Sequence, residues 1–260
     1  MTEGVELVHL ERAGAVTTVT LDSPANRNAL SRRLVAQLAA CLRTAEDSAA
    51  TRVVLLTHTG TTFCAGADLR EAAGLGMERG TADLLALLAA VLRLGKPVVA
   101  VVRGHVRAGG IGLLGACDLA VVSNDSTYAF SEARLGLAPA VISLTTRTRL
   151  GDRDAARLFL TGEVFDGVEA ARCGLVTRSV PAEDLPGAVE ALSSSLARVS
   201  PQGARETKSL LNGPLLERIE RDGADLTALS ARLFASAEAR EGMAAFRERR
   251  PPRWETQVAD

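Results

Sequence analysis

The stretch "VRGHVRAGGIGLLGACDLAVV", residues 102–122, decides how the centre of this chain folds. It begins as a loop, passes through a cluster of glycines and continues as an apolar helix. Gly109 and Gly110 lie where the loop becomes the helix, and the first N–H groups of a helix have no partner within it. The helix dipole adds partial positive charge at the same place, which suits a negatively charged oxygen. Because the cluster contains no Ser, His or acidic residue, we expect the backbone to act there.

The remaining glycines of this stretch have a simpler interpretation. Gly112 and Gly115 are expected to permit close packing of a core helix. A glycine cluster by itself is weak evidence for a dinucleotide-binding fingerprint. A nicotinamide-dependent oxidoreductase is therefore disfavoured, and it would predict measurable NAD binding.

Composition limits the class of protein. The 260 residues are enough for a sizeable core, and 47% are apolar but only 3% aromatic, so Ala, Leu and Val build that core. The 30 Lys and Arg nearly balance the 31 Asp and Glu, which gives no reason to expect nucleic acid or an anionic membrane as a partner. The four cysteines are widely spaced, as in reduced intracellular proteins, and suggest no metal site. No signal peptide and no apolar run of about 20 residues is visible, so we expect a soluble, cytoplasmic protein.

Strand-turn-helix units repeat through the first two thirds of the chain, as in α/β proteins. Alternating or continuous apolar runs predict strands at 15–21, 51–59, 95–102, 117–123, 126–130 and 174–180. Helices are expected at 31–47, with Ser31 as the cap, and at 82–94, 143–150, 152–160 and 166–172. Beyond residue 184 the pattern is helical, with helices at 185–199, 202–211, 215–240 and 243–249 and a break at Gly213-Pro214. The boundary at 199–201 predicts a core of residues 1–199 and a helical region of residues 200–260.

Two further loops follow strands at their carboxyl ends, where open α/β structures place ligands. The loop "FCAGADL", residues 63–69, has small residues that let a ligand approach the backbone, although in isolation a tight turn that reverses the chain is the favoured interpretation. Glu132 lies in "FSEARLGLAP", residues 130–139. A loop glutamate is usually solvated or caps a helix, but an apolar pocket would raise its proton affinity and make it a base. Ala133, Leu135, Leu137 and Pro139 are candidates for the walls of such a pocket.

Five blocks in order resemble the crotonase, or enoyl-CoA hydratase/isomerase, superfamily. They are "LDSPANRNALS" (21–31), "FCAGADLRE" (63–71), "KPVVAVVRGHVRAGGIGLLGACDLAV" (96–121), "FSEARLGLAP" (130–139) and "LTGEVFDGVEAARCGLVTRSVP" (160–181). The resemblance extends from about Val8 to the closing "EGMAAFRERRPPRW" (241–254). It implies an α/β fold of the ClpP/crotonase type, a spiral of ββα units followed by a C-terminal helical region that mediates trimerisation.

The resemblance also assigns catalytic roles. It implies that the N–H groups of Ala67 and Gly109 hold the thioester oxygen of an acyl-CoA, while Glu132 transfers protons. Charge develops on that oxygen as an enolate forms, and one preorganised donor contributes roughly 3 kcal/mol in other enzymes. Ala108 stands where the family often has a glycine.

One departure concerns the reaction. Family hydratases with two catalytic glutamates carry one of them where this chain has Gly112. A single carboxylate is enough to isomerise a 3-enoyl-CoA to a 2-enoyl-CoA, whereas the pattern as a whole resembles members described as hydratases. We expect an enoyl-CoA hydratase of fatty-acid or other acyl-CoA metabolism. The alternatives are an isomerase and an inactive acyl-CoA-binding homologue.

The resemblance places coenzyme A, which is part of the substrate rather than a cofactor, against two segments. These hold Arg27, Ala65, Gly66, Ala67, Asp68 and Leu69, with Asp68 stabilising its own loop. The basic residues Arg247, Arg249, Arg250 and Arg253 either reach the phosphates or form a solvated tail. His105 is expected to be structural, and Tyr128 and Phe130 to pack in the core. A homotrimer or a hexamer of two trimers is the assembly that the family implies.

Overall fold

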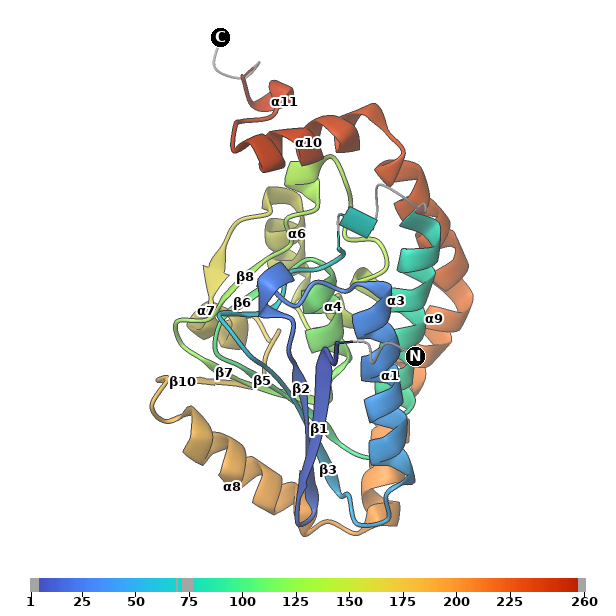
Figure 1. The fold of residues 1–260 in the computed structure, drawn as a ribbon, viewed down its shortest axis with the longest axis vertical. Helices are drawn as coiled ribbons and strands as arrows, with labels where there is room; N and C mark the ends of the chain where they lie inside the picture. The colour runs from blue at the N-terminus through green and yellow to red at the C-terminus, as the bar shows by residue number, and fades with distance from the viewer. Residues whose placement is uncertain (1–4, 69, 72–76, 257–260) are drawn as a thin grey trace.

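Two β-sheets form the framework of the computed structural model, which describes residues 5–68, 70–71 and 77–256 (Figure 1). The larger sheet has six strands in the order β1-β2-β3-β5-β7-β10. These strands are β1 (Val8–Ala13), β2 (Val16–Leu21), β3 (Val53–His58), β5 (Val98–Val102), β7 (Leu119–Ser123) and β10 (Arg178–Val180). The smaller sheet is ordered β4-β6-β8-β9 and consists of β4 (Thr62–Cys64), β6 (His105–Arg107), β8 (Thr127–Ala129) and β9 (Phe165–Asp166).

The chain passes from one sheet to the other in a repeating order. β3 is followed by β4, β5 by β6 and β7 by β8, and each of these pairs places its first strand in the larger sheet and its second in the smaller one. The pairings β2–β3, β3–β5, β5–β7, β4–β6 and β6–β8 are all parallel, so each turn advances the chain in one direction. This is the predicted spiral of ββα units.

Helices cover both faces of the larger sheet because its strands are apolar on both sides. On β3, Val54 packs in the main core with α1 (Arg32–Asp47) and α3 (Met77–Arg93), whereas its neighbour Val53 packs in a second cluster with Leu185 of α8 (Leu185–Ala197). Successive side chains of a strand point to opposite faces, which explains the division. Figure 1 shows α8 on one side and α1 and α3 on the other.

The helix α1 forms where the sequence predicts it. Ser31 accepts a hydrogen bond from the Leu34 amide, which satisfies one of the free N–H groups at the helix start. Leu34, Leu38 and Leu42 lie on one face and are fully buried. The predicted helix, with its cap at Ser31 and its end at Asp47, therefore agrees with the structure.

The break predicted at Gly213-Pro214 is wrong. One helix, α9 (Pro201–Phe234), runs through both residues. The buried Lys208 ammonium group donates to the carbonyls of Val91 and Lys96 and pairs with the Asp118 carboxylate at 2.8 Å. These contacts hold α9 along α3 and outweigh the backbone hydrogen bond that Pro214 removes.

Four strands are absent from the sequence prediction. β1 lies in a segment that is charged and exposed at its end, and β4, β6 and β9 have three, three and two residues. Strands this short leave no readable alternation. Besides α8 and α9, the helices in the second half of the described chain are α5 (Ser143–Thr146), α6 (Asp152–Thr161), α7 (Gly167–Arg172), α10 (Ala237–Glu248) and α11 (Arg253–Thr256).

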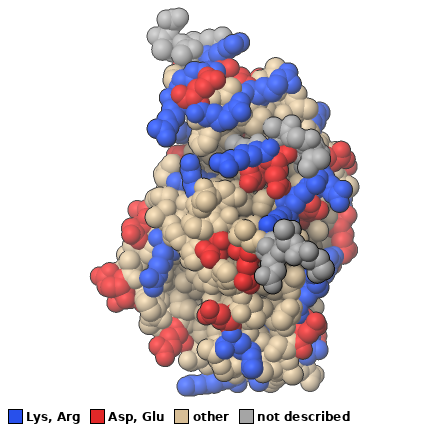
Figure 2. Space-filling model, viewed as in Figure 1, with Lys and Arg blue, Asp and Glu red and all other residues tan. Residues whose placement is uncertain are grey.

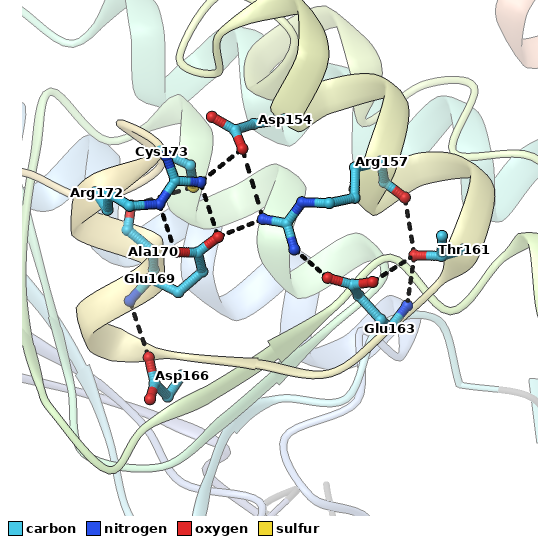
Figure 3. Close-up of polar contacts among 9 residues, drawn as sticks. All are labelled: Asp154, Arg157, Thr161, Glu163, Asp166, Glu169, Ala170, Arg172 and Cys173. Atoms are coloured by element: carbon cyan, nitrogen blue, oxygen red, sulfur yellow. Dashed lines mark hydrogen bonds and ion pairs between the residues drawn. The ribbon is translucent and has the colours of Figure 1, made fainter.

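A network of charged side chains joins α6 to α7 and to the loop between them (Figure 3). Arg157 pairs with Glu163 and Glu169, while Arg172 pairs with Glu169 at 2.6 Å and with Asp154 at 2.6 Å. Isolated surface ion pairs contribute little, but a network with shared partners fixes geometry. It holds α6 in place, and the C-terminal end of α6 contacts the segment that follows β8.

The surface carries charges of both signs. Figure 2 shows Lys and Arg interspersed with Asp and Glu over this face, with basic side chains gathered at the end where α10 lies. This agrees with the balanced composition. Among the helices of the described residues, none has both the length and the apolar character needed to cross a membrane.

Candidate active site

A cavity of about 1200 Å³ is lined by residues from all three segments that were predicted from the sequence to form the site. Its walls include Ala67 from the loop after β4, Gly109 at the start of α4 (Gly109–Ala116), and Glu132 after β8. The parallel strands β4, β6 and β8 are neighbours in the smaller sheet, so the segments that follow them meet at one edge. Topology therefore gathers residues that are far apart in the sequence.

The two glycine-containing loops are in direct contact. Gly66 has a φ of +89°, and a Cβ atom added there would lie 3.2 Å from the Gly109 nitrogen and 3.0 Å from the Ala108 Cβ. A side chain at position 66 would thus separate the loops. Gly66 is required both for its backbone conformation and for this approach.

The amides of Ala67 and Gly109 are available to a ligand. Gly109 is the first residue of α4, so its N–H has no acceptor within the helix. Neither amide donates a hydrogen bond to another residue in the part of the chain that the structure describes. Both residues line the cavity. The site therefore offers two neighbouring segments with free backbone donors.

Ala108, which stands where the family often has a glycine, carries backbone strain. Its φ of +46° and ψ of −120° lie in a region that residues with a side chain rarely adopt. Such a conformation costs on the order of 1–3 kcal/mol and persists where the surroundings impose it. Ala108 directly precedes α4, so its conformation determines how the chain enters the helix at Gly109, a residue that lines the cavity.

Glu132 is the buried carboxylate of the cavity. It is 8% exposed, and its Oε2 has no hydrogen-bond partner among the described residues. Burial raises its pKa from 4.5 to about 7, because the charged form loses hydration. Its side chain makes no capping hydrogen bond to the 3₁₀ turn η2 (Ala133–Leu135), so it is not a helix cap. A carboxyl group with this pKa is able to take up and release a proton near neutral pH.

The walls around Glu132 are largely as predicted. Leu135, Leu137 and Pro139 line the cavity. Ala133, which was also predicted to form a wall, is not among the lining residues. The apolar character of the walls supplies the desolvation that shifts the pKa of Glu132.

Gly112 and Gly115 have the packing role that the sequence suggested. A Cβ at position 112 would lie 2.6 Å from the Ile142 Cγ2, and a Cβ at position 115 would lie 2.9 Å from the Thr145 oxygen. Gly110, Gly112 and Gly115 have the G-x-G-x-x-G spacing of a dinucleotide-binding fingerprint. All three glycines are nevertheless buried against protein atoms, so they leave no room for a dinucleotide beside them.

The comparison with protein families decides the identity. The family model described as "Enoyl-CoA hydratase/isomerase" matches residues 11–257. The chain belongs to the enoyl-CoA hydratase/isomerase family. The predicted crotonase-type fold is confirmed, since the crystal structure of an enoyl-CoA hydratase from Mycobacterium avium superimposes with a TM-score of 0.90. That protein is 48% identical, and the match covers 96% of this chain and 100% of that one.

More distant members of the enoyl-CoA hydratase/isomerase family agree. An enoyl-CoA hydratase/isomerase from Pseudoalteromonas atlantica has a TM-score of 0.86 at 30% identity, with 95% of this chain and 99% of that chain covered. The mevalonyl-coenzyme A hydratase of Aspergillus fumigatus is 32% identical over 92% of this chain and 91% of its own length. The similarity thus covers nearly the whole of both partners.

The segments assigned to coenzyme A lie together in this family member. Ala65, Ala67, Asp68 and Arg27 line the cavity, and the Ala65 amide donates to the Arg27 carbonyl at 3.1 Å. Gly66 lies between the lining residues, and Leu69 lies outside the described residues.

Asp68 stabilises its own loop, as predicted. Its carboxylate accepts hydrogen bonds from the Arg70 amide at 3.0 Å and from the Asn26 side chain at 3.1 Å. Asn26 also lines the cavity, and sequence reasoning missed it. Asn26 lies in residues 21–31, a segment that resembles the family, and this position could have identified it as a candidate.

The C-terminal basic residues divide between the two interpretations. Arg250 lines the cavity, but its guanidinium already pairs with Glu241 and Glu248, both at 2.7 Å. Arg247, Arg249 and Arg253 are not among the lining residues. Sequence reasoning missed that α10 forms a wall of the cavity, which Gly242, Ala245 and Phe246 line.

Three remaining expectations concern structural residues. His105 Nδ1 lies 2.8 Å from the Thr127 hydroxyl, which joins β6 to β8. Tyr128 and Phe130 are fully buried in the core. Within the described residues, no group of three His, Cys, Asp or Glu side chains is arranged to hold a metal ion.

Proposed function

We propose that this family member is an enoyl-CoA hydratase, which adds water to the double bond of a 2-enoyl-CoA thioester or removes it from the product. The observation that carries the proposal is one cavity lined by Ala67 and Gly109, whose amides donate to no other described residue, and by Glu132, whose carboxyl group is buried. The named relatives, which are described as hydratases, support the same reaction.

The proposed mechanism uses the amides as an oxyanion hole. The thioester oxygen accepts hydrogen bonds from the N–H groups of Ala67 and Gly109. Glu132 takes a proton from water as the hydroxide oxygen bonds to the β-carbon, and the electron pair of the double bond moves toward the thioester oxygen. The resulting enolate is stabilised by the two donors. Protonated Glu132 then returns a proton to the α-carbon, so the enzyme is unchanged at the end.

The CoA moiety supplies binding energy rather than chemistry. We propose that it lies against Arg27, Ala65, Gly66 and Asp68, with Leu69 completing the segment. No cofactor takes part in this mechanism. Binding energy from the non-reacting part of the substrate orients the thioester between the amides and Glu132.

Replacing Glu132 by Gln tests the base. Glu132→Gln is expected to lower turnover of a 2-enoyl-CoA by 10²–10⁴-fold, the range typical of a lost general base, while retaining thioester binding. Glu46→Gln is the control, because this carboxylate bonds the Gly95 amide away from the cavity. Full activity in Glu132→Gln would refute the assignment.

A second reaction, isomerisation of a 3-enoyl-CoA to a 2-enoyl-CoA, is favoured by one observation. Ile142 occupies the space beside Gly112, so no second carboxylate projects from that position. One carboxyl group is enough to move a proton between two carbons. Supplying 2-enoyl-CoA and 3-enoyl-CoA separately distinguishes the reactions: a hydratase forms the 3-hydroxy product from the 2-enoyl substrate. Conversion of the 3-enoyl substrate alone would establish the isomerase, and binding without turnover would establish an inactive acyl-CoA-binding homologue.

We further propose a homotrimer or a hexamer of two trimers, located in the cytoplasm, with residues 200–260 contributing to assembly. The free cysteines of the described chain agree with a reducing compartment. Light scattering of the purified protein tests the assembly, and a monomer would contradict it.

A further inference from the structure

The backbone of the turn that carries Glu132 lies directly against the backbone of helix α10. Gly136 ends the turn η2 with a φ of +70°. A Cβ atom at this position would lie 2.7 Å from the carbonyl carbon of Glu238 and 2.8 Å from its oxygen. These distances leave no room for a side chain, so the end of the turn lies directly against the first turn of α10.

The contact is repeated from the side of the helix. A Cβ atom on Gly242 would lie 2.5 Å from the Leu135 oxygen and 2.6 Å from the Leu135 carbonyl carbon. The two glycines thus allow two stretches of backbone to meet without side chains between them. Figure 1 shows α10 crossing the end of the molecule above this turn. Backbone atoms do not rearrange as a flexible side chain would, so the contact fixes the separation of the two elements.

The opposite side of the turn is also held. Arg134 donates from its Nε to the Thr161 carbonyl at 2.8 Å, at the C-terminal end of α6. A Cβ on Gly162 would lie 3.1 Å from the Phe130 oxygen. The turn η2 is therefore enclosed between α6 and α10, and a displacement of α10 is transmitted to it.

The turn is coupled to Glu132 by short hydrogen bonds. The Glu132 carbonyl accepts from the amides of Leu135 and Leu137, both at 2.9 Å. Its own position therefore follows that of the turn. Glu132 and Gly242 also line the same cavity, so α10 lies beside the space in which the carboxyl group acts.

Helix α10 is itself firmly placed. The Ser236 hydroxyl accepts from the Ala239 amide at 3.0 Å and caps the helix. Ala239 and Ala245 are almost fully buried, and Glu241 pairs with Arg250 beyond the end of the helix. The helix thus has the rigidity that a positioning element needs.

We infer that α10 positions the base: contact of Gly242 with the Leu135 backbone sets where the Glu132 carboxyl group stands relative to the amides of Ala67 and Gly109. This rests on the proposed function, since it takes Glu132 as the base. Residues 237–248 then contribute to catalysis within one chain, in addition to the proposed contribution of the C-terminal region to assembly. Gly242 is a positioning residue, and it does not touch the reacting atoms.

The test is Gly242→Ala, with Gly213→Ala as the matched control. Both changes add one methyl group to a helix, but a Cβ at Gly213 has no atom within 4 Å. Ala favours helix over Gly, so the change itself does not unwind α10. We expect Gly242→Ala to lower kcat about 100-fold, because a misplacement of about 1 Å has that effect, with KM unchanged within about twofold. Gly213→Ala is expected to keep the wild-type kcat.

A merely structural role predicts a different pattern. It would lower the thermal midpoint or the folded fraction, while kcat per folded molecule stayed at the wild-type value. If Gly242→Ala fails to fold, Ser236→Ala loosens the helix start without adding volume, and kcat is expected to fall severalfold at constant KM. Wild-type kcat per folded molecule in the variants that fold would overturn the inference. The outcome is separable from that of the proposed function, because loss of activity in Glu132→Gln together with unchanged kcat in Gly242→Ala refutes only the positioning role.

Discussion

The substitution Glu132→Gln is expected to stabilise the folded protein at neutral and alkaline pH while it removes the proposed base. The side chain is 8% exposed and its Oε2 lacks a hydrogen-bond partner among the described residues. Burial raises the pKa of Glu132 from 4.5 to about 7, so between these values the folded state binds more protons than the unfolded chain. The stability that Glu132 contributes through its raised pKa is therefore fully present below about pH 4.5 and is lost as the pH rises through about 7.

The magnitude follows from the two pKa values. A tenfold change in proton affinity corresponds to about 1.4 kcal/mol, so ionising Glu132 costs about 3 kcal/mol more in the folded state than in the unfolded chain. About 2.5 kcal/mol of this loss falls between about pH 5 and about pH 8. The Gln variant has no charge to desolvate, so its free energy of unfolding does not show this loss.

Urea denaturation of both proteins at about pH 5 and about pH 8 gives the required comparison. The free energy of unfolding of the wild type, relative to the variant, should fall by about 2.5 kcal/mol between these conditions. Subtracting the variant cancels the titration of all other groups. An equal difference at both pH values would show that Glu132 ionises normally and would refute the reasoning.

Two further substitutions test the packing of the core, one beside the site and one at the contact of α9 with α3. Gly112→Ala is expected to destabilise the fold by about 1–3 kcal/mol, because its Cβ would lie 2.6 Å from the Ile142 Cγ2, whereas Gly213→Ala should be neutral or stabilising by up to about 1 kcal/mol. Equal effects in chemical denaturation would contradict this. Lys208→Met should cost about 3 kcal/mol, because the Asp118 carboxylate loses its ion-pair partner at 2.8 Å but keeps hydrogen bonds from the Val98 amide and the Asn212 side chain. An unchanged denaturation midpoint would show that the pair carries no stability.

Sequence reasoning succeeded where local chemistry determines the structure. Ser31 and the spacing of Leu34, Leu38 and Leu42 determine the start and the buried face of α1 without help from the rest of the chain. Glu132 was a candidate because it follows a strand at its carboxyl end and matches a family motif, and the structure shows it buried in a cavity that Leu135 and Leu137 also line.

It failed where tertiary contacts override local preference. Pro214 stands within a continuous helix because Lys208 and other buried residues of α9 are held against α3. The strands β4 and β6 have three residues each and exist only because β4 pairs with β6 and β6 pairs with β8. No local signal distinguishes such segments from loops.

The least predictable features are contacts between distant residues at the site. The φ of +46° at Ala108 is imposed on a residue that does not favour it. The approach of Gly242 to Leu135 joins positions more than 100 residues apart. In the sequence, Gly242 is an ordinary glycine in a helical segment, and only the folded structure shows that it contacts Leu135.

The claim on which the account depends is that one buried carboxyl group with a pKa of about 7 acts as the base. The pH dependence of kcat/KM tests it most directly, measured with a 2-enoyl thioester that lacks the CoA phosphates, so that no substrate group titrates in the same range. The account predicts that kcat/KM rises tenfold per pH unit up to a midpoint near 7 and is constant above it. A kcat/KM that is constant between about pH 5 and about pH 8 would contradict it.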